Sequence, residues 1–479
     1  MSVVKNYIYN TVYQIMMIFI PLITMPYLTR IFTPDQIGLQ AYTLSIASYF
    51  MLFGMLGMQM YANRQVAYVR DDKEMLNKTF WSLYATQIVT CIISLLLYYV
   101  YVGFLVNNDI VIYLIQGLNI LSVLLDVSWL FMGLEDFKKV VVRNTIVKLV
   151  GLAAIFIFIK SSDDLALYIF LTILVNIIGM LSMWVYLPKY VGKISVDFKI
   201  IKSTIKPLLK LFLPQVASQV YVLLSRTMIG VLSTKEQLAF YDYSQKIVRM
   251  ILALITSIGV VLMPRVANII GNGRHDEVSS IIEKTFKFVS YIAMPMAIGL
   301  MCISRILVSW FLGPEFNEVG NLTAISSIII IAVSWANIIG VQYLIATKQE
   351  NKYTLSIVIA AIVNLLMNVV LIKAYGALGA VIALVAAEFI GIIIQLLLVR
   401  KELNVTKMLY GVIKYIIAAI IMGIVITPIG NIIKNGFAAN IIQATLGVGI
   451  YALIMFIIKD EVQKDIFKSI KSMIKKKHL

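Results

Sequence analysis

The sequence has 479 residues, of which 61% are hydrophobic and only 14% are charged, and its mean hydropathy is +0.91. Soluble domains are about 45–50% apolar and about 25% charged, so the composition excludes an ordinary soluble protein. The 41 Lys and Arg against 24 Asp and Glu leave a net charge of +17, which is typical of a protein that meets nucleic acid or a membrane surface. Two histidines, His275 and His478, leave little material for a metal or acid–base centre, and Cys91 and Cys302 imply no disulfide framework.

Apolar runs long enough to cross a bilayer follow one another along the chain. A spanning helix needs about 20 apolar residues at 1.5 Å per residue. The fourteen runs that meet this length are 8–29, 38–61, 80–103, 110–132, 140–159, 165–187, 210–232, 240–263, 288–312, 322–346, 354–373, 376–399, 408–429 and 438–458. We therefore expect an all-α polytopic membrane protein with fourteen transmembrane helices and no cleaved signal peptide.

The connections between these runs alternate in charge. Lys and Arg concentrate in every second connection and in the C-terminal tail, whereas the other connections hold about one each. The basic residues of the connections that hold about one each are Arg30, Lys160, Lys235, Lys373 and Lys434. Because cytoplasmic loops carry the basic excess, the pattern predicts that both termini are cytoplasmic in a bacterial plasma membrane, and it excludes nucleic acid as a partner. The basic segments 189–210 and 459–479 are either interfacial helices on anionic lipid or solvated basic segments.

Two halves of the chain resemble each other. TPDQIGLQAY from Thr33 matches TKEQLAFYDY from Thr234, and IFIK ending at Lys160 parallels VLIK ending at Lys373. We expect two parallel six-helix repeats followed by two extra helices. The predicted organisation is an N-lobe at 1–188, a basic cytoplasmic linker at 189–209, a C-lobe at 210–400, helices 13 and 14 at 401–458 and a basic tail at 459–479. Duplicated bundles suit a transporter whose halves rock against each other.

Charged residues inside apolar runs are costly and usually face a bundle interior or an aqueous cavity. The predicted cationic, substrate-binding residues are Arg226, Arg249, Lys246 and Lys148, and the acids that either couple ions or stabilise helices are Asp126, Glu388 and Asp242. Arg suits a phosphate or pyrophosphate because its guanidinium donates two parallel hydrogen bonds. The alternatives are an intrahelical pair between Asp242 and Lys246, and a structural pair between Asp126 and Lys148. Arg305, Arg143 and Lys414 lie near helix ends and are expected to reach the interface.

Prolines lie in helices 1 and 7, which occupy matching positions in the two repeats. Pro26 and Pro214 could provide bends used in gating or could be static kinks. Arg64 and Arg265 match at the inner ends of helices 2 and 8, and Arg30 follows helix 1. No phosphate-binding Gly-Lys-Ser/Thr loop or metal-ligand spacing is found, so we expect no cofactor, and energy from the membrane potential, H⁺ or Na⁺.

The order and spacing of several stretches resemble the polysaccharide flippase family (Wzx-like) of the multidrug/oligosaccharidyl-lipid/polysaccharide exporter superfamily. These stretches include YLTRIFTPDQIGLQAY (27–42), FMGLEDFKKVVVRNTIVK (131–148), LPQVASQVYVLLSRTMIGVL (213–232) and QYLIATKQENKYT (342–354). The resemblance implies a V-shaped pair of lobes that moves an undecaprenyl-pyrophosphate-linked oligosaccharide to the outer leaflet. It further implies membrane lipids, a polysaccharide polymerase and glycosyltransferases as partners. The fourteen predicted helices exceed the twelve that are common in this family, and the two extra ones are helices 13 and 14.

Two other functions remain open from the sequence. A drug/cation antiporter of the same superfamily should favour buried carboxylates, whereas the intramembrane excess here is basic. A glycan polymerase or acyltransferase would need a large outer loop or a His/Asp centre, and no predicted outer loop exceeds about a dozen residues. We therefore expect a transporter and not an enzyme.

Overall fold

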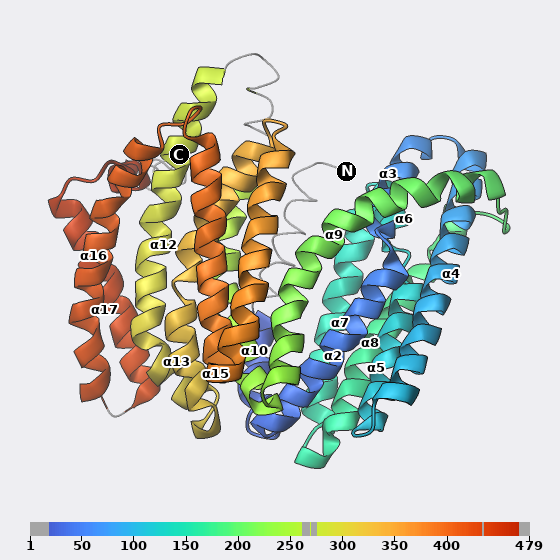
Figure 1. Ribbon diagram of the computed structural model, residues 1–479, viewed down its shortest axis with the longest axis horizontal. Coiled ribbons are helices and arrows are strands. Elements are labelled where there is room, and N and C mark those ends of the chain that lie inside the picture. Colours follow the sequence, from blue (N-terminus) through green and yellow to red (C-terminus); the bar gives the residue numbers. More distant parts are fainter. Residues whose placement is uncertain (1–18, 261–268, 270–274, 434, 469–479) are drawn as a thin grey trace, which may run out of the picture. The chain divides into compact units, whose positions relative to one another are not determined.

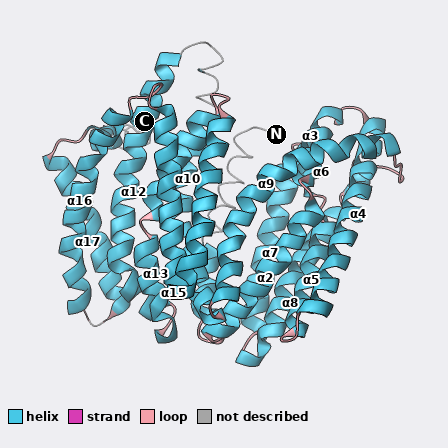
Figure 2. Cartoon of the chain, viewed as in Figure 1, coloured by secondary structure: helices cyan, strands magenta, loops and turns pink. Residues whose placement is uncertain are grey.

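The computed structural model describes residues 19–260, 269, 275–433 and 435–468, and the regular elements in these residues are all helices (Figures 1 and 2). Nine described helices are long and apolar enough to cross a bilayer, or ten if a pair of helices bent by 47° forms one span. The all-α membrane fold is therefore confirmed. The first predicted span, 8–29, lies mostly outside the described residues, which show only the helix Phe19–Leu28 from it.

The chain forms two compact units, residues 1–231 and 232–479. The sequence places the division in the linker 189–209, but α9 (Phe198–Leu232) continues unbroken from that linker into the predicted helix 210–232. Its Thr227 hydroxyl lies 3.3 Å from the Ser45 hydroxyl and donates to the Tyr49 hydroxyl at 3.2 Å. These contacts join the end of α9 to α2 (Pro34–Met55) within the first compact unit.

Besides α9 and the helix at 19–28, seven α-helices build the described part of the first unit, and the longer ones run side by side (Figure 1). They are α2, α3 (Met58–Val69), α4 (Lys73–Leu105), α5 (Ile110–Leu124), α6 (Ser128–Gly133), α7 (Phe137–Phe158) and α8 (Leu165–Trp184). α2 packs on α4 and α5, and α8 packs on α5 and α7. A buried cluster that includes Phe80, Trp129 and Phe131 holds α4 against α6.

Two predicted spans of the first unit are broken. Gly57 separates α2 from α3 with φ +76, and a Cβ there would lie 3.3 Å from the Phe212 nitrogen, so glycine suits both the backbone angle and the close approach. Between α5 and α6 the helix opens, and the Asp126 carboxylate accepts from the Ser128 N–H at 2.8 Å. The buried Gln87 amide donates to the carbonyls of Val123 and Asp126 at 2.8 and 2.9 Å. A broken helix at membrane depth needs such side-chain donors because lipid cannot satisfy its carbonyls.

Besides a short helix at 461–468, the described residues of the second unit form seven α-helices and a π-helix. They are α10 (Lys235–Val260), α12 (His275–Phe311), α13 (Asn317–Ser326), α14 (Ile329–Ala336), the π-helix η4 (Asn337–Ile345), α15 (Glu350–Val399), α16 (Val405–Ile432) and α17 (Gly436–Ile457). α12 contacts α13, α16 and α17.

α15 is a helical hairpin and not one long helix. Gly376 has φ +56 and ψ −129, a conformation that L residues rarely adopt, and it divides the two predicted runs 354–373 and 376–399. Gln395 donates to the Ser356 hydroxyl at 3.1 Å, and a Cβ on Gly391 would lie 3.4 Å from the Ala360 Cβ. The two arms therefore pack antiparallel, as the sequence predicts for two successive helices.

The two C-terminal helices belong to the body of the second unit. The Tyr451 hydroxyl on α17 donates to the Tyr291 carbonyl on α12 at 2.9 Å. Trp310 donates to Asn440 at 2.7 Å, and Gln443 donates to the Ile426 carbonyl at 2.9 Å. These hydrogen bonds make α16 and α17 integral to the packing around α12.

Candidate functional site

A cavity of about 350 Å³ lies within the first unit, among the helix at 19–28, α2, α5, α7 and α8. Its polar lining residues are Thr24, Gln40, Gln116, Asn119, Lys148, Tyr168, Thr172 and Asn176. Its remaining walls are aliphatic, from residues such as Leu44, Leu152 and Ile173. The lining therefore combines one cation with several neutral hydrogen-bonding groups and apolar surface.

The cavity's amides form an ordered network. Asn119 donates to the Gln116 side-chain oxygen at 2.7 Å, and Gln116 donates to the Thr43 hydroxyl at 3.2 Å. Gln116 and Asn119 are both buried. Because buried amides bound to each other cannot rotate freely, their orientation is fixed before any ligand enters.

Lys148 is the one cation among the described residues that line this cavity. It lies on α7 and makes no hydrogen bond or ion pair with any residue that the structure describes. The pair with Asp126 that the sequence left open is not formed, since Asp126 instead caps the break before α6. A cation without a protein partner at mid-span is costly unless it faces water or an anion.

The other predicted cations lie on α9 and α10. Lys246 pairs with Asp242 at 2.8 Å, which is the intrahelical pair that the sequence offered as an alternative. The Asp242 side chain is buried, and Lys246 also lies 4.7 Å from the centre of the Tyr243 ring. Arg249, one turn further along α10, is exposed, and Arg226 on α9 is half-buried.

The remaining predicted residues lie at several separate places. Glu388 is half-buried on the second arm of α15. Pro26 is in the helix at 19–28, where its carbonyl accepts from the Arg30 guanidinium, and Arg64 on α3 lies 5.8 Å from the centre of the Tyr61 ring. Pro214 lies within α9, and Arg265 lies outside the described residues. The structure thus brings together Asp242 and Lys246 but places Lys148 in a cavity with residues that the sequence did not single out.

An acid, a lysine and a tyrosine join the ends of the helical hairpin α7–α8. The Asp136 carboxylate lies 2.8 Å from the Lys139 ammonium and accepts from the Tyr190 hydroxyl at 2.8 Å. Burial alone would raise the pKa of the Asp136 carboxyl, but the hydrogen bonds from Lys139 and Tyr190 outweigh it and hold this pKa below its usual value.

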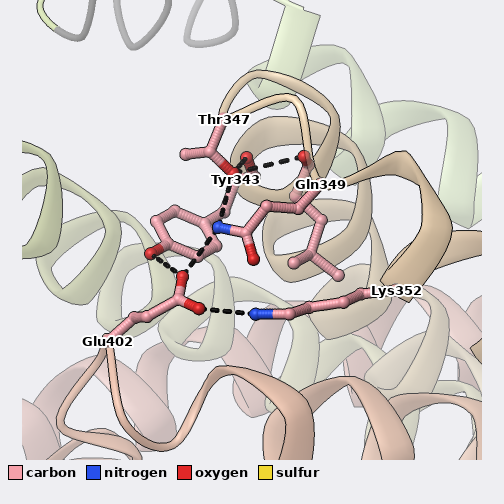
Figure 3. Close-up of polar contacts among 6 residues, drawn as sticks. Tyr343, Thr347, Gln349, Lys352 and Glu402 are labelled. Carbon is pink, nitrogen blue, oxygen red and sulfur yellow. Dashed lines mark hydrogen bonds and ion pairs between the residues drawn. The ribbon is translucent and has the colours of Figure 1, made fainter.

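A second acid–lysine–tyrosine cluster joins the ends of the α15 hairpin (Figure 3). Glu402 accepts from the Tyr343 hydroxyl and from the Gln349 amide, both at 2.7 Å, and its other oxygen lies 2.5 Å from the Lys352 ammonium. Burial opposes ionisation of Glu402, yet these three donors lower its pKa below the usual value. We call the two groups the Asp136 clamp and the Glu402 clamp.

A third cluster closes the hairpin α16–α17. Lys414 forms an ion pair with the buried carboxylate of Asp460, which also accepts from the Tyr415 hydroxyl at 3.1 Å. Lys414 therefore has a protein partner, although the sequence predicts that it reaches the interface. Gln463 donates to the Ala452 carbonyl at 3.0 Å, so the start of the predicted basic tail is anchored on α17.

The second unit has a cavity of different chemistry. It measures about 420 Å³ and is lined mainly by apolar residues of α12, α16 and α17, among them Pro295, Met422 and Val448. Gln443 is the one amide among its described lining residues. This cavity carries no charged lining residue among the described ones and is suited to apolar groups only.

Sequence reasoning missed both the amides of the first cavity and the clamps. Gln40, Gln116 and Asn176 lie in three different apolar runs, and each alone reads as an ordinary membrane amide. Their spacing along α2, α5 and α8 carries no common motif, so only the packing of those helices reveals the cavity. Asp136, Tyr190 and Glu402 lie in connections between apolar runs and carry no motif in the sequence.

Comparison with known proteins extends over nearly the whole chain. An O-antigen transporter of Escherichia coli K12, so named provisionally, is 23% identical over 407 residues, which is 84% of this chain and 98% of that protein. A protein of Shigella dysenteriae with the same provisional name is 25% identical and covers 79% of this chain and 96% of its own length.

Solved structures share the fold. The inward closed conformation of lipid II flippase MurJ matches with a TM-score of 0.75 at 15% identity, covering 95% of this chain and 98% of that one. An inward-facing multidrug resistance transporter of the MATE family in the MOP superfamily matches with a TM-score of 0.63 at 10% identity, covering 81% and 95%. The sequence model of the family described as "Polysaccharide biosynthesis protein" matches residues 3–270. Since this match covers more than half of the chain, the protein belongs to the polysaccharide biosynthesis protein family.

Proposed function

We propose that this protein is a flippase that moves undecaprenyl-pyrophosphate-linked oligosaccharide units from the inner to the outer leaflet by alternating access. The observation that carries the proposal is the family match, supported by relatives that are provisionally named O-antigen transporters and match almost from end to end. The fold shared with a lipid II flippase is consistent with it. The glycan would be a capsule, exopolysaccharide or teichoic-acid unit.

The physical task of such a protein is to carry a hydrated, charged headgroup through hydrocarbon. An anion in a medium of low dielectric constant is stabilised by nearby cations and by preoriented hydrogen-bond donors. We propose that Arg226, Lys246, Arg249 and Lys148 contact the anionic substrate during the transport cycle. Arg249 is exposed and Lys148 lines a cavity, so both can be reached by a ligand.

We further propose fourteen helices, with two related six-helix bundles, and cytoplasmic termini in a bacterial plasma membrane. Thr33 and Thr234 support the repeat because each accepts at a helix N-terminus, from the Gln36 N–H at 3.4 Å and the Gln237 N–H at 3.2 Å. Lys139 and Lys352 support it as well, since each pairs with a carboxylate at the ends of a helical hairpin. The separation of these two lysines is also that of Lys160 and Lys373, whose surroundings match in sequence.

Energy and partners follow from this assignment. With no bond to break, the membrane potential or a gradient of H⁺ or Na⁺ would drive the cycle, and Asp126, Glu388 and Asp242 are the acids within the spans. A polymerase and glycosyltransferases of the same glycan are the expected protein partners. A MATE-like drug antiporter shares the fold, but it would have to bind cations in a protein whose proposed contacts are basic.

A strain depleted of the protein tests the proposal. We expect undecaprenyl-linked glycan to accumulate on the inner leaflet, measured by its protection from an externally added glycosidase or lectin. Export of a fluorescent cationic drug should be unchanged. Intact surface glycan without accumulation, or loss of drug export alone, contradicts the flippase assignment.

A further inference from the structure

We propose that the cavity of the first unit is a binding site for an acidic sugar residue, a hexuronate, of the transported glycan. The inference rests on the proposed function and adds a specific subsite to it. It names the chemical group that Lys148 recognises and the unit that holds it.

The size of the cavity fits one sugar ring and not a whole headgroup. Pockets for small ligands measure about 300–1,000 Å³, and this cavity of about 350 Å³ is at the lower end of that range. An oligosaccharide with its pyrophosphate would exceed it. The ligand should therefore enter as a single residue of a longer glycan.

The charge of the lining fits a single carboxylate. Lys148 is the one ionisable side chain among the cavity's described lining residues apart from the Tyr168 phenol, and no described lining residue is a carboxylate. A lysine ammonium is a compact point charge, whereas pyrophosphate is usually held by several cations or by the two-pronged guanidinium of arginine. One lysine without a protein partner therefore favours a monoanion.

The neutral part of the lining fits the hydroxyl groups and the apolar face of a sugar. The backbone carbonyl of Gln40 accepts from Gln116, but the Gln40 side-chain amide makes no hydrogen bond with the described residues. Its donors and acceptor are therefore available to a ligand in the cavity. Gln116 and Asn119 are held in place by each other, and the aliphatic side chains of Leu44 and Ile173 form a wall against which C–H groups can pack. Binding sites of this kind use a few oriented polar groups on a mainly apolar wall.

Binding of a soluble probe tests this site separately from transport. The full-length protein in lipid nanodiscs is titrated with the methyl glycoside of D-glucuronate, and contact is followed by saturation-transfer NMR. The matched variants are Lys148→Gln, Lys148→Arg and Lys160→Gln, the last carrying the same change just beyond the outer end of α7. Each variant is first compared with the wild type by its melting temperature.

We expect wild type and Lys160→Gln to bind the probe, Lys148→Gln to bind at least tenfold more weakly, and Lys148→Arg to recover most of the binding. Methyl glucoside should compete poorly. Equal binding by wild type and Lys148→Gln, no binding by the wild type, or displacement of the probe by inorganic phosphate overturns the hexuronate site. Since the readout does not involve translocation, the site can fail while the flippase assignment stands, and the reverse is also true.

Discussion

Gln36 and Gln237 make equivalent contacts in the two units, each joining the start of one helix to the turn between two later helices. The Gln36 amide donates to the Ser162 carbonyl at 2.8 Å, in the turn between α7 and α8. The Gln237 side-chain oxygen accepts from the Ala377 N–H at 2.9 Å, in the turn between the arms of α15. Both glutamines also lie three residues after a threonine that caps the same helix. A glutamine near the start of α2 or α10 thus binds the turn of a later hairpin, α7–α8 or α15, as a donor in the first unit and as an acceptor in the second.

Removing either contact should destabilise its own unit. Gln36→Leu and Gln237→Leu each lose a side-chain hydrogen bond to backbone, which is worth about 1 kcal/mol. We expect a small fall in melting temperature for both, measured by scanning fluorimetry in nanodiscs. Gln65→Leu, at a site where the side chain makes no hydrogen bond with the described residues, is the control. An equal fall in the melting temperature of Gln65→Leu would show that these hydrogen bonds do not stabilise their units.

Gly376 should tolerate no side chain. Its φ of +56 with ψ −129 is strained for any L residue, and a Cβ would lie 2.6 Å from the Gln237 side-chain oxygen. Gly376→Ala should therefore cost roughly 1–3 kcal/mol. Gly449→Ala on α17, where a Cβ meets open space, should be neutral or slightly stabilising because alanine favours helix. Equal melting temperatures of the two variants would contradict the hairpin turn at Gly376.

The Glu402 clamp should make stability depend on pH. Because the Glu402 pKa is lowered in the folded protein, its contribution is present above the unfolded pKa of about 4.3 and is lost as pH falls through the folded value. Glu402→Gln should lower stability near pH 7 by about 1–3 kcal/mol, since the Lys352 and Tyr343 donors lose a charged acceptor. The difference from wild type should shrink below about pH 4.

Melting curves from pH 3.5 to pH 8 measure this effect. Glu350→Gln is the matched control, since Glu350 lies in the first turn of α15, the helix that carries Lys352, and forms no ion pair within the described residues. A difference in melting temperature between wild type and Glu402→Gln that stays constant across this pH range would contradict the assigned role of the carboxylate.

Arg226 and Arg249 should be required for transport but not for folding. Arg226→Ala and Arg249→Ala are each expected to reduce complementation of surface glycan by tenfold or more while membrane abundance stays normal. Arg400→Ala, an exposed arginine beyond α15, should complement fully. Full complementation by both Arg226→Ala and Arg249→Ala would show that neither arginine is a required substrate contact.

Much of the fold could be predicted because hydropathy and charge act locally along the chain. The apolar runs predicted α4, α7, α8, α16 and α17 within a few residues, except that α4 extends seven residues beyond its run at the N-terminal end. The breaks were not predicted, because an opened helix in lipid survives only where a distant side chain such as Gln87 satisfies its carbonyls.

The candidate site could be predicted only in part. Lys148 stood out as a charge inside an apolar run, and the pair Asp242–Lys246 followed from helical spacing. Gln40, Gln116 and Asn119 could not be distinguished from structural amides, because their common cavity depends on the packing of α2 and α5 with α7 and α8. Lys414 was assigned to the interface because its partner Asp460 lies beyond another full helix.

Reconstituted translocation tests the central claim most directly. Purified protein is placed in liposomes that contain a fluorescent undecaprenyl-pyrophosphate oligosaccharide in both leaflets, and dithionite added outside bleaches the accessible fluorophore. We predict that bleaching proceeds beyond one half in liposomes with the wild-type protein and stops at about one half with Arg249→Ala. Bleaching that stops at one half with the wild-type protein, under an imposed membrane potential and with H⁺ or Na⁺ gradients, would contradict the account.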